Sequence, residues 1–189
     1  MPQTFEDLLI EKKDFSNQPV PAGDYDNCTF RGCNFSQSDL SGINFTDCLF
    51  EECNLGNARL LNSTLNDVRF KECKMPGLGF ETTSSYLFTV EFSGCQLDYS
   101  SFFQRKLKKT LFENCSLKQV DFTDADLTEA IFRQCNFDKA KFENTLLEKA
   151  DLRTSFGYSI DPELNRISRA RFAWPALLGL LEKYRIEAE

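Results

Sequence analysis

The residues best able to do chemistry in this chain of 189 residues are its 8 cysteines. A catalytic thiol needs a neighbouring base or a positive environment, and the chain contains no histidine. A zinc site needs ligands that converge on one point, whereas each cysteine here occupies a position that alanine or serine takes elsewhere in the sequence. We therefore expect no catalytic residue, no metal site and no cofactor, and we predict that the protein is not an enzyme.

A period of five residues explains where the cysteines lie. From Tyr25 to Phe80 every fifth residue is apolar, and after a slip of two residues the series resumes at Leu87 and runs to Leu152. Two residues before each of these positions the side chain is nearly always small, and all 8 cysteines occupy that small position. Neither a helix, with apolar residues three and four apart, nor a strand alternating by two can bury such a pattern. A chain that turns a corner every five residues can bury it.

The pattern resembles the pentapeptide repeat protein family. Units such as Ser38-Asp39-Leu40-Ser41-Gly42 and Ala125-Asp126-Leu127-Thr128-Glu129 carry the family motif, and the resemblance covers residues 25 to 154. It implies an all-β solenoid, a right-handed quadrilateral β-helix with four pentapeptides in each coil. The sequence supports this coil length, because one set of cysteines would then stack in a single column. Its members are Cys33, Cys53, Cys73 and, beyond the slip, Cys95, Cys115 and Cys135.

The two ends of the chain depart from the repeat, and the open coils of a solenoid need to be covered. We expect residues 1–24 to form an N-terminal cap, 25–154 to form the β-helix, and 155–189 to form a C-terminal connector, strand and helix for capping and dimerisation. The strand is predicted at 167–172 and the helix at 175–184, with a proline in its first turn. The residues expected to cover the last coil and to pair with a second copy are Phe172, Trp174, Leu177, Leu178, Leu181 and Tyr184.

The charge of the chain is unevenly distributed. Residues 1–100 hold 15 acidic and 7 basic side chains, net −8, whereas residues 101–189 hold 14 and 15, net +1. Over the roughly 31 Å expected for the β-helix, duplex DNA carries about eighteen negative charges. The net charge of −7 therefore excludes imitation of DNA over the whole surface, and any DNA-like surface must be one concentrated face. The candidates are Asp24, Asp26, Asp47 and Asp67, with Glu51, Glu52 and Glu72 on the adjoining face.

Two places interrupt the repeat. The slip before Leu87 predicts a bulge or small loop on the outside of the β-helix, and loops on rigid scaffolds often carry binding residues. The loop residues are Glu81, Thr82, Thr83, Ser84, Ser85 and Tyr86. The second interruption is Arg105, which stands in a small position, so either the coil bulges there or the charged head reaches solvent or a carboxylate.

The C-terminal sequence narrows the resemblance. Residues 160–167, Ile-Asp-Pro-Glu-Leu-Asn-Arg-Ile, and residues 175–181, Pro-Ala-Leu-Leu-Gly-Leu-Leu, look like the C-terminal region of the topoisomerase-protecting branch of the family, the Qnr, McbG and AlbG type. The resemblance implies a homodimer, joined through its C-terminal element, that binds bacterial DNA gyrase or topoisomerase IV. It implies DNA mimicry by an acidic surface and protection of the enzyme from antibiotics such as quinolones or from toxins, as in an immunity protein. The long second loop of Qnr proteins has no counterpart in this sequence.

The residues alone leave an alternative, because the repeat itself carries no function. The chain is then a generic pentapeptide-repeat scaffold for protein interactions with no topoisomerase role. No stretch is apolar enough for a membrane span, and the N-terminus lacks the basic start of a signal peptide, so we expect a cytoplasmic protein without a membrane partner. The phenylalanines point inward in the five-residue register, so we expect no direct binding of nucleic acid.

Overall fold

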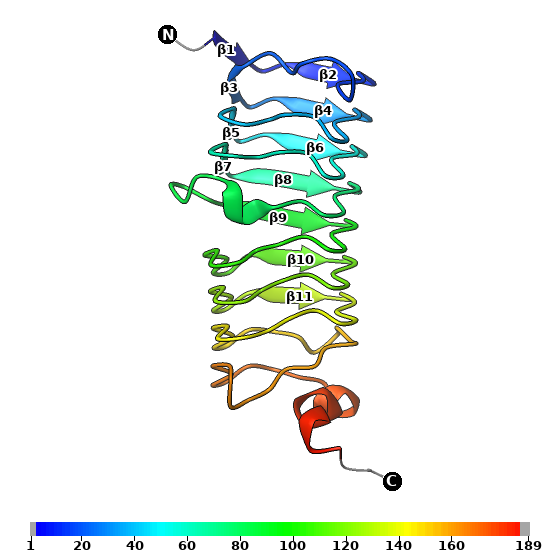
Figure 1. Ribbon diagram of the computed structural model, residues 1–189, viewed down its shortest axis with the longest axis vertical. Coiled ribbons are helices and arrows are strands. Elements are labelled where there is room, and N and C mark those ends of the chain that lie inside the picture. Colours follow the sequence, from blue (N-terminus) through cyan, green and yellow to red (C-terminus); the bar gives the residue numbers. More distant parts are fainter. Residues whose placement is uncertain (1–2, 186–189) are drawn as a thin grey trace.

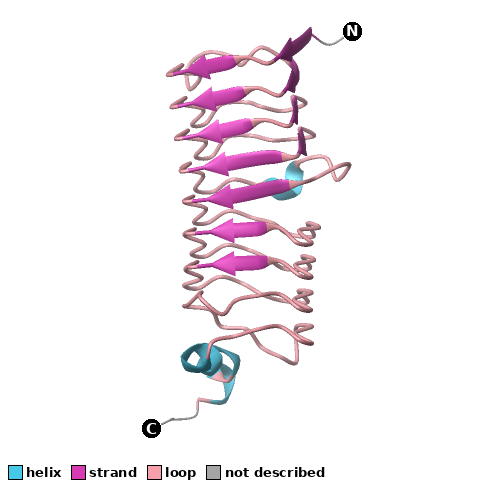
Figure 2. Ribbon diagram, turned by 180° about the vertical axis from the view of Figure 1, so that it is seen from behind, coloured by secondary structure: helices cyan, strands magenta, loops and turns pink. Residues whose placement is uncertain are grey.

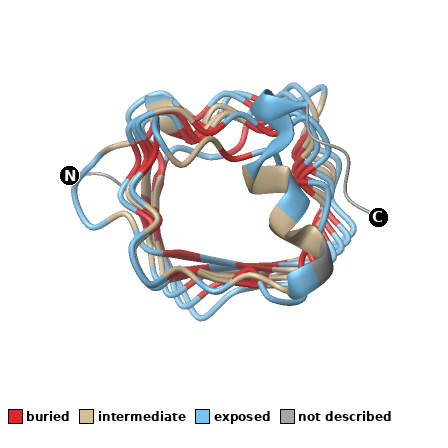
Figure 3. Cartoon of the chain, turned by 90° about the horizontal axis from the view of Figure 1, so that it is seen from below, coloured by how far each residue is buried: buried red, intermediate tan, exposed pale blue. Residues whose placement is uncertain are grey.

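The chain winds through stacked parallel coils around one core (Figures 1 and 2). The computed structural model describes residues 3–185. Its strands pair in parallel throughout the two sheets, and each coil has four sides when it is seen along the axis (Figure 3). This is the quadrilateral β-helix that the resemblance to the pentapeptide repeat family implied.

Regular strands occupy two of the four sides. The strand order is β1-β3-β5-β7 in a four-stranded sheet and β11-β10-β9-β8-β6-β4-β2 in a seven-stranded sheet. The four-stranded sheet consists of β1 (Gln3–Glu6), β3 (Gly23–Asp26), β5 (Asn44–Thr46) and β7 (Thr64–Asn66). The seven-stranded sheet consists of β2 (Leu9–Glu11), β4 (Thr29–Arg31), β6 (Leu49–Glu51), β8 (Val68–Lys71), β9 (Val90–Ser93), β10 (Leu111–Glu113) and β11 (Ile131–Arg133). The other two sides are joined by isolated parallel bridges, such as that between Asn34 and Asn54.

Inward side chains of successive coils stack on one another and form the core. Every position of the five-residue series between Tyr25 and Leu152 is buried except Leu87. The Phe92 and Phe112 rings stack with centroids 5.0 Å apart and planes 17° apart. Each such aromatic pair contributes about 0.5–1.5 kcal/mol beyond the burial of its surface. The columns of rings thus hold neighbouring coils in one register.

At most corners the chain turns at the second residue after the large inward one. That residue has a left-handed backbone, for example at Asn27 (φ 50°), Asp47 (φ 51°) and Asn57 (φ 53°). Asparagine, aspartate and glycine tolerate this conformation better than other residues. Their recurrence at the corners therefore follows from the geometry of the coil.

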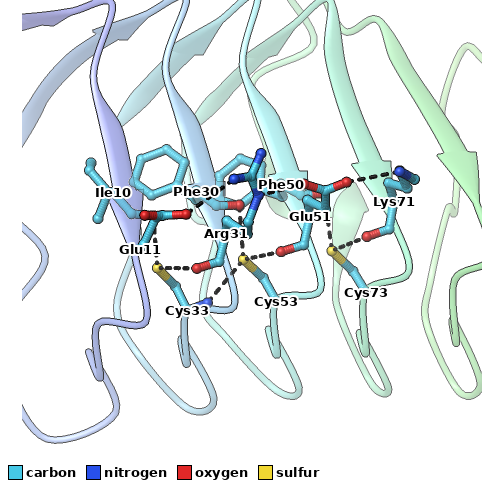
Figure 4. A network of polar contacts seen from close by, with 10 residues as sticks. All are labelled: Ile10, Glu11, Phe30, Arg31, Cys33, Phe50, Glu51, Cys53, Lys71 and Cys73. Carbon is cyan, nitrogen blue, oxygen red and sulfur yellow. Dashed lines mark hydrogen bonds and ion pairs between the residues drawn. The ribbon is translucent and has the colours of Figure 1, made fainter.

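Cysteine suits the small inward position in its chemistry as well as in its size. The Cys53 Sγ donates to the carbonyl oxygens of Phe30 and Glu51, both at 3.3 Å (Figure 4). Thr145 also occupies a small position, and its hydroxyl donates to a core carbonyl at 2.9 Å in the same way. All eight cysteines are free and buried, and burial raises the pKa of the Cys48 thiol to about 12. The cysteines are packing residues, as predicted.

The β-helix begins before residue 25, where the sequence predicted a separate cap over residues 1–24. β1 pairs with β3 and β2 pairs with β4. The Phe5 ring stacks on Tyr25 at 4.5 Å, and Phe15 stacks on Phe35 at 4.9 Å. The five-residue series therefore starts at Phe5, and the N-terminal segment is the first coil itself. Residues 1 and 2 of the expected cap lie outside the described residues.

The C-terminal segment also differs from the prediction. The expected strand at 167–172 is a turn of the last coil, joined to it by single bridges at Arg166 and Arg171. The helix expected at 175–184 is two short 3-10 helices, η2 (Trp174–Leu180) and η3 (Glu182–Tyr184). A 3-10 helix has three residues per turn, so it turns a different set of apolar side chains inward than an α-helix would. Residues 186–189 of the predicted C-terminal region lie outside the described residues.

A close contact fixes η2 against the last coil. The amide of Ile160 donates to the carbonyl oxygen of Gly179 at 2.9 Å. A Cβ atom at Gly179 would lie 2.1 Å from the carbonyl oxygen of Tyr158, so only glycine fits there. Ala176 and Leu180 pack against the core from the same helix. The helix η2 therefore covers the C-terminal end of the β-helix.

The outer surface of the seven-stranded sheet carries side chains of alternating charge, one in each coil (Figure 4). We call them the charge row, which consists of Glu11, Arg31, Glu51 and Lys71. The Arg31 guanidinium lies 3.1 Å from the Glu11 carboxylate and 2.7 Å from the Glu51 carboxylate. The Lys71 Nζ lies 2.8 Å from Glu51 on its other side. Hydrogen bonds from Lys71 and Arg31 lower the pKa of the Glu51 carboxyl. Glu51 was expected in an acidic surface, but two neighbouring cations offset its charge.

Replacing Phe102 with alanine should lower the free energy of unfolding by about 3–5 kcal/mol, because it opens a cavity in a column of stacked rings. Phe102 is 0% exposed, whereas the adjacent Phe103 is 37% exposed. The matched variant Phe103→Ala should therefore cost less than about 1 kcal/mol. Urea unfolding followed by circular dichroism compares the two. Equal losses in both variants would contradict the inward register.

Replacing Arg31 with methionine should raise the pKa of Glu51 towards the ordinary glutamate value, because one of its two donors is lost. In the native chain a lowered pKa means that the stabilisation from this carboxylate is present above the ordinary glutamate pKa. It is lost as the pH falls through the lowered value. NMR titration of the Glu51 carboxyl measures the change. The control is Arg59→Met, which removes an arginine that lies 3.5 Å from Asp39 on another side of the β-helix. If the pKa of Glu51 is the same in both variants, the charge row does not form in solution.

Candidate partner-binding surface

Four of the seven predicted acidic residues lie together on the side of the four-stranded sheet. Asp24 and Asp26 alternate with the buried Tyr25 in β3 and therefore point outward. Asp47 and Asp67 occupy the corners that follow β5 and β7, with left-handed φ angles of 51° and 52°. Both corner residues are exposed. The parallel pairing of the coils thus brings together four carboxylates that are far apart in the sequence.

Two further acidic residues extend this surface and were missed in the sequence. Glu6 is the register partner of Asp26 between β1 and β3, and Asp7 accepts a hydrogen bond from Asn27 Nδ2 at 2.7 Å. Both lie in the first coil, and the continuation of the five-residue series back to Phe5 was the signal that could have found them. We call the outer surface formed by these six residues the acidic sheet. Its members are Glu6, Asp7, Asp24, Asp26, Asp47 and Asp67.

The acidic sheet contains no positive side chain. The four segments that form it include no lysine or arginine. They are residues 4–7, 24–27, 44–47 and 64–67. Within residues 3–185 none of its six carboxylates takes part in an ion pair. Four coils at about 4.8 Å spacing span about 14 Å, a length over which duplex DNA carries about eight charges. The local charge of the acidic sheet therefore approaches that of a duplex, although the net charge of the whole chain does not.

The other three predicted acidic residues do not join this surface. Glu51 lies in the charge row of the seven-stranded sheet. Glu52 and Glu72 occupy the corners at the far edge of that sheet, with φ angles of 54° and 53°. The width of one whole side separates them from the acidic sheet. The acidic surface expected over two sides is thus confined to one.

The predicted loop lies where a fifth strand would continue the four-stranded sheet (Figure 1). It begins with the 3-10 helix η1 (Phe80–Thr82), and Thr83 then donates its hydroxyl to the carbonyl of Phe80 at 2.8 Å. Thr83 is buried, whereas Ser85 and Tyr86 are exposed. The loop therefore has a packed base and a projecting tip.

The core position after the slip was misassigned in the sequence. Leu87 was expected to point inward, but its side chain is 51% exposed and its backbone is left-handed (φ 52°). Phe88 packs against the core instead, with its ring 6.4 Å from the ring of Phe80. The inserted residues thus shift the inward position by one and leave Leu87 at the tip beside Tyr86.

Arg105 closes the base of the loop. The coil does not bulge at this residue, because its amide donates to Phe102 at 3.0 Å as at other small positions. Its guanidinium donates to the carbonyl oxygens of Glu81 and Thr83, both at 2.5 Å. The three outcomes expected from the sequence, a bulge, solvent or a carboxylate, were therefore wrong. Backbone carbonyls of the loop receive the charged group.

The sign of the charge changes across the loop. Lys106, Lys108 and Lys109 lie in the next coil on the same side, and Lys106 is the bridge partner of Asp126 one coil further on. The Lys108 Nζ lies 3.3 Å from the Asp126 carboxylate. Beyond the loop this side therefore carries mixed charges, and the acidic sheet is confined to the four coils on its N-terminal side.

The six predicted dimer residues divide into two groups. Phe172 and Leu177 are half-buried. The other four are exposed, with Trp174 at 85%, Tyr184 at 54%, Leu178 at 50% and Leu181 at 36%. Ion pairs from Lys183 to Asp161 and Glu163, both at 2.7 Å, hold η3 beside the last coil. The C-terminal end of the rod therefore presents an apolar surface.

The part of the chain that the structure describes shows neither a metal-binding cluster nor a membrane-spanning helix. Within residues 3–185 no group of three or more histidine, cysteine, aspartate or glutamate side chains has an arrangement that could hold a metal ion. No helix in the same range is long and apolar enough to cross a membrane. The acidic sheet, the loop and the C-terminal apolar surface are thus the features from which a function can be argued.

Two solved structures illustrate how the fold compares with known proteins. Full-length QnrB1, a plasmid-mediated fluoroquinolone resistance protein, matches with a TM-score of 0.53 and 18% identity, covering 97% of this chain and 100% of that one. HetL, a pentapeptide repeat protein involved in heterocyst differentiation regulation from the cyanobacterium Nostoc, matches with a TM-score of 0.41 and 15% identity, covering 89% of this chain and 86% of that one. No curated protein sequence matches the chain. At 18% identity the match to QnrB1 establishes the fold alone.

The sequence itself matches a known family. The family is described as the pentapeptide repeat region, and the matched residues are 24–102 and 85–156. These two overlapping ranges cover most of the chain and coincide with stacked coils of the structure. The chain therefore belongs to the pentapeptide repeat family.

Proposed function

We propose that the protein is a homodimer without enzymatic activity that binds DNA gyrase or topoisomerase IV and protects the enzyme from quinolones or other poisons. The observation that carries the proposal is the acidic sheet, which presents six carboxylates and no cation on one side of the β-helix. A topoisomerase holds duplex DNA on a basic surface. An acidic surface of similar charge density competes for the same contacts.

The acidic sheet supports competition for phosphate contacts in particular. It offers negative charge at regular intervals but none of the base edges that carry sequence information. Contacts of this kind supply the salt-dependent part of DNA binding. The field of the exposed carboxylates acts mainly within about 8 Å at physiological salt, so the partner must approach this side closely.

The β-helix sets the spacing of the charges before any partner binds. Asp24 is the register partner of Asn44 and also accepts a hydrogen bond from its Nδ2 at 2.6 Å. Little conformational freedom is therefore lost on binding, which favours affinity. Protection by this mechanism requires occupancy of the enzyme surface and no chemical step.

The C-terminal apolar surface supports the homodimer. Trp174, Leu178, Leu181 and Tyr184 are exposed at the end of the rod opposite the acidic sheet. A two-fold axis through this end would bury the same surface of both copies. Both acidic sheets would then lie at the far ends of the dimer and remain accessible.

The fold of this chain is similar to that of a drug-resistance protein. QnrB1 is described as a fluoroquinolone resistance protein, and its full length is covered by this chain. The C-terminal segments 160–167 and 175–181 add the resemblance in sequence. A scaffold for another protein would use the same surfaces, so the decisive test must use the topoisomerase itself.

Purified protein at micromolar concentration should restore supercoiling by bacterial gyrase in the presence of a quinolone. A variant with Asp24, Asp26, Asp47 and Asp67 all replaced by Asn should bind gyrase at least about tenfold more weakly, with a smaller salt dependence, because counterion release depends on the charges that meet. Asparagine tolerates the left-handed corners, so the fold should be retained. A supercoiling assay and a binding titration at two salt concentrations measure both effects.

The matched control makes the same change in net charge on the two sides without regular strands. Its substitutions are Asp14→Asn, Asp39→Asn, Asp124→Asn and Asp138→Asn. This variant should protect gyrase as the native protein does. Equal losses in both variants would contradict a role for the acidic sheet, and a native protein that neither binds nor rescues gyrase would favour the scaffold.

Replacing Trp174 with serine and Leu178 with glutamine should convert the dimer to a monomer, because both side chains are exposed in the single chain. Multi-angle light scattering measures the mass of the native chain and of this variant. A control variant, Leu61→Gln, changes a side chain that is 51% exposed on another part of the rod and should leave the mass unchanged. A native protein with the mass of one chain would contradict the proposed dimer.

A further inference from the structure

Arg105 is a buried charged residue in a position that elsewhere takes a small side chain. Only 8% of its surface is exposed. The corresponding positions in the following coils are Ala125 and Thr145. The backbone at Arg105 is regular, since its carbonyl accepts from Asp126 at 2.8 Å. The side chain alone departs from the repeat, and its burial must be offset by specific contacts.

The contacts of the guanidinium are all with the loop. Nη2 donates to the carbonyl oxygens of Glu81 and Thr83 at 2.5 Å, and Nη1 donates to that of Ser84 at 3.3 Å. The Phe88 ring lies over the guanidinium, with its centroid 5.3 Å from Cζ. The Arg105 side chain thus contacts residues on both sides of the loop tip, Glu81 to Ser84 before it and Phe88 after it.

The loop needs such a donor because it leaves the hydrogen-bonding pattern of the coils. In a regular coil each carbonyl oxygen of a strand accepts from the amide one coil away. Here the strand of this side is missing between β7 and the coil of Lys106. Within residues 3–185 no backbone amide donates to the carbonyl oxygens of Glu81, Thr83 and Ser84. A buried carbonyl without a donor is costly, and the planar guanidinium supplies several donors from one point.

The loop tip projects beside the acidic sheet. Tyr86 is 72% exposed and Leu87 is 51% exposed. Thr89, where the loop rejoins the sheet, lines a hollow of about 150 Å³ together with Asp47 and Asp67 and with Arg69 and Glu91 of the adjoining side. The exposed Tyr86 and Leu87 therefore belong to the segment that follows β7 at the edge of the acidic sheet.

We propose that Arg105 is a positioning residue, which holds the loop so that Tyr86 and Leu87 meet the same partner as the acidic sheet. This inference rests on the proposed function and names a second element of the same interface. The partner surface that fits is a basic one with an apolar recess at its edge. Exposed aromatic anchors on ordered loops contribute most to such interfaces, because less freedom is lost on binding.

The test is a double-mutant cycle in gyrase binding between Arg105→Met and Tyr86→Ala. Methionine keeps much of the length of the side chain and removes the donors. Each single variant should weaken binding by about tenfold. Because Arg105 acts through the loop tip, the double variant should bind within about threefold of Tyr86→Ala, whereas independent effects would multiply to about a hundredfold. A multiplied loss would overturn the proposal.

Hydrogen–deuterium exchange of the protein alone tests the positioning step without gyrase. Amides of residues 84–89 should exchange at least about tenfold faster in Arg105→Met, while those of β8 and β10 stay protected. Arg59→Met is the matched control, because Arg59 is an exposed arginine paired with Asp39, and it should change neither exchange nor binding. Unchanged loop exchange in Arg105→Met would overturn the proposal.

Two further outcomes separate this inference from the proposed function. If the native protein does not bind gyrase, the proposed function fails and the shared interface falls with it, while the exchange experiment still decides whether Arg105 orders the loop. If Arg105→Met does not fold, Arg105→Lys keeps the charge with fewer donors and should show the same two effects at smaller size. Exchange and binding equal to those of the native protein in Arg105→Lys would then overturn the proposal.

Discussion

The structure depends on one constraint, which is that each inward side chain must stack on the equivalent side chain of the next coil. The Phe30 and Phe50 rings do so at 4.7 Å, and the Phe112 and Phe132 rings do so at 4.9 Å. The stacking fixes the coil length, since any change in the number of residues between corners would bring large side chains onto small ones. An insertion is tolerated only if it leaves the coil as a loop, as it does between Ser84 and Thr89.

The same constraint distributes the charges. Outward residues one coil apart are held at a fixed spacing, so the sequence of each row decides whether it becomes neutral or strongly charged. Glu51 lies in a row where acids and bases alternate, and its charge is offset. Asp47 and Asp67 lie in a row that holds no base on the N-terminal side of the loop, and their charges add. The surface charge of this scaffold is therefore a property of rows of residues and not of single ones.

Most of the fold could be predicted from the sequence, because the residues that recur every five positions are the ones that form the core. The period also located the loop and singled out Arg105 as abnormal. It could not show the contacts of Arg105, because those depend on the path of a segment that has no period. It could not show that Leu87 would give its place to Phe88 either, since both are large and apolar and only the conformation of the loop decides between them.

The candidate surface was predicted in part. The aspartate row was found because the register of Asp47 and Asp67 follows from the coil length. Glu6 and Asp7 were missed because the first coil has fewer repeat features than the others, with Pro19 and Pro21 interrupting it. The type of the C-terminal helix could not be predicted from the sequence either, because ten residues have too little intrinsic preference for one helix type.

The central claim is that the acidic sheet is the side of the rod that meets gyrase, and carboxyl footprinting of the complex by mass spectrometry tests it most directly. Bound gyrase should protect Asp26, Asp47 and Asp67 from labelling by a carbodiimide and an amine. Glu52 and Glu72, across the width of the seven-stranded sheet, should be labelled as in the free protein. Protection of Glu52 and Glu72 with free labelling of the three aspartates would contradict the claim.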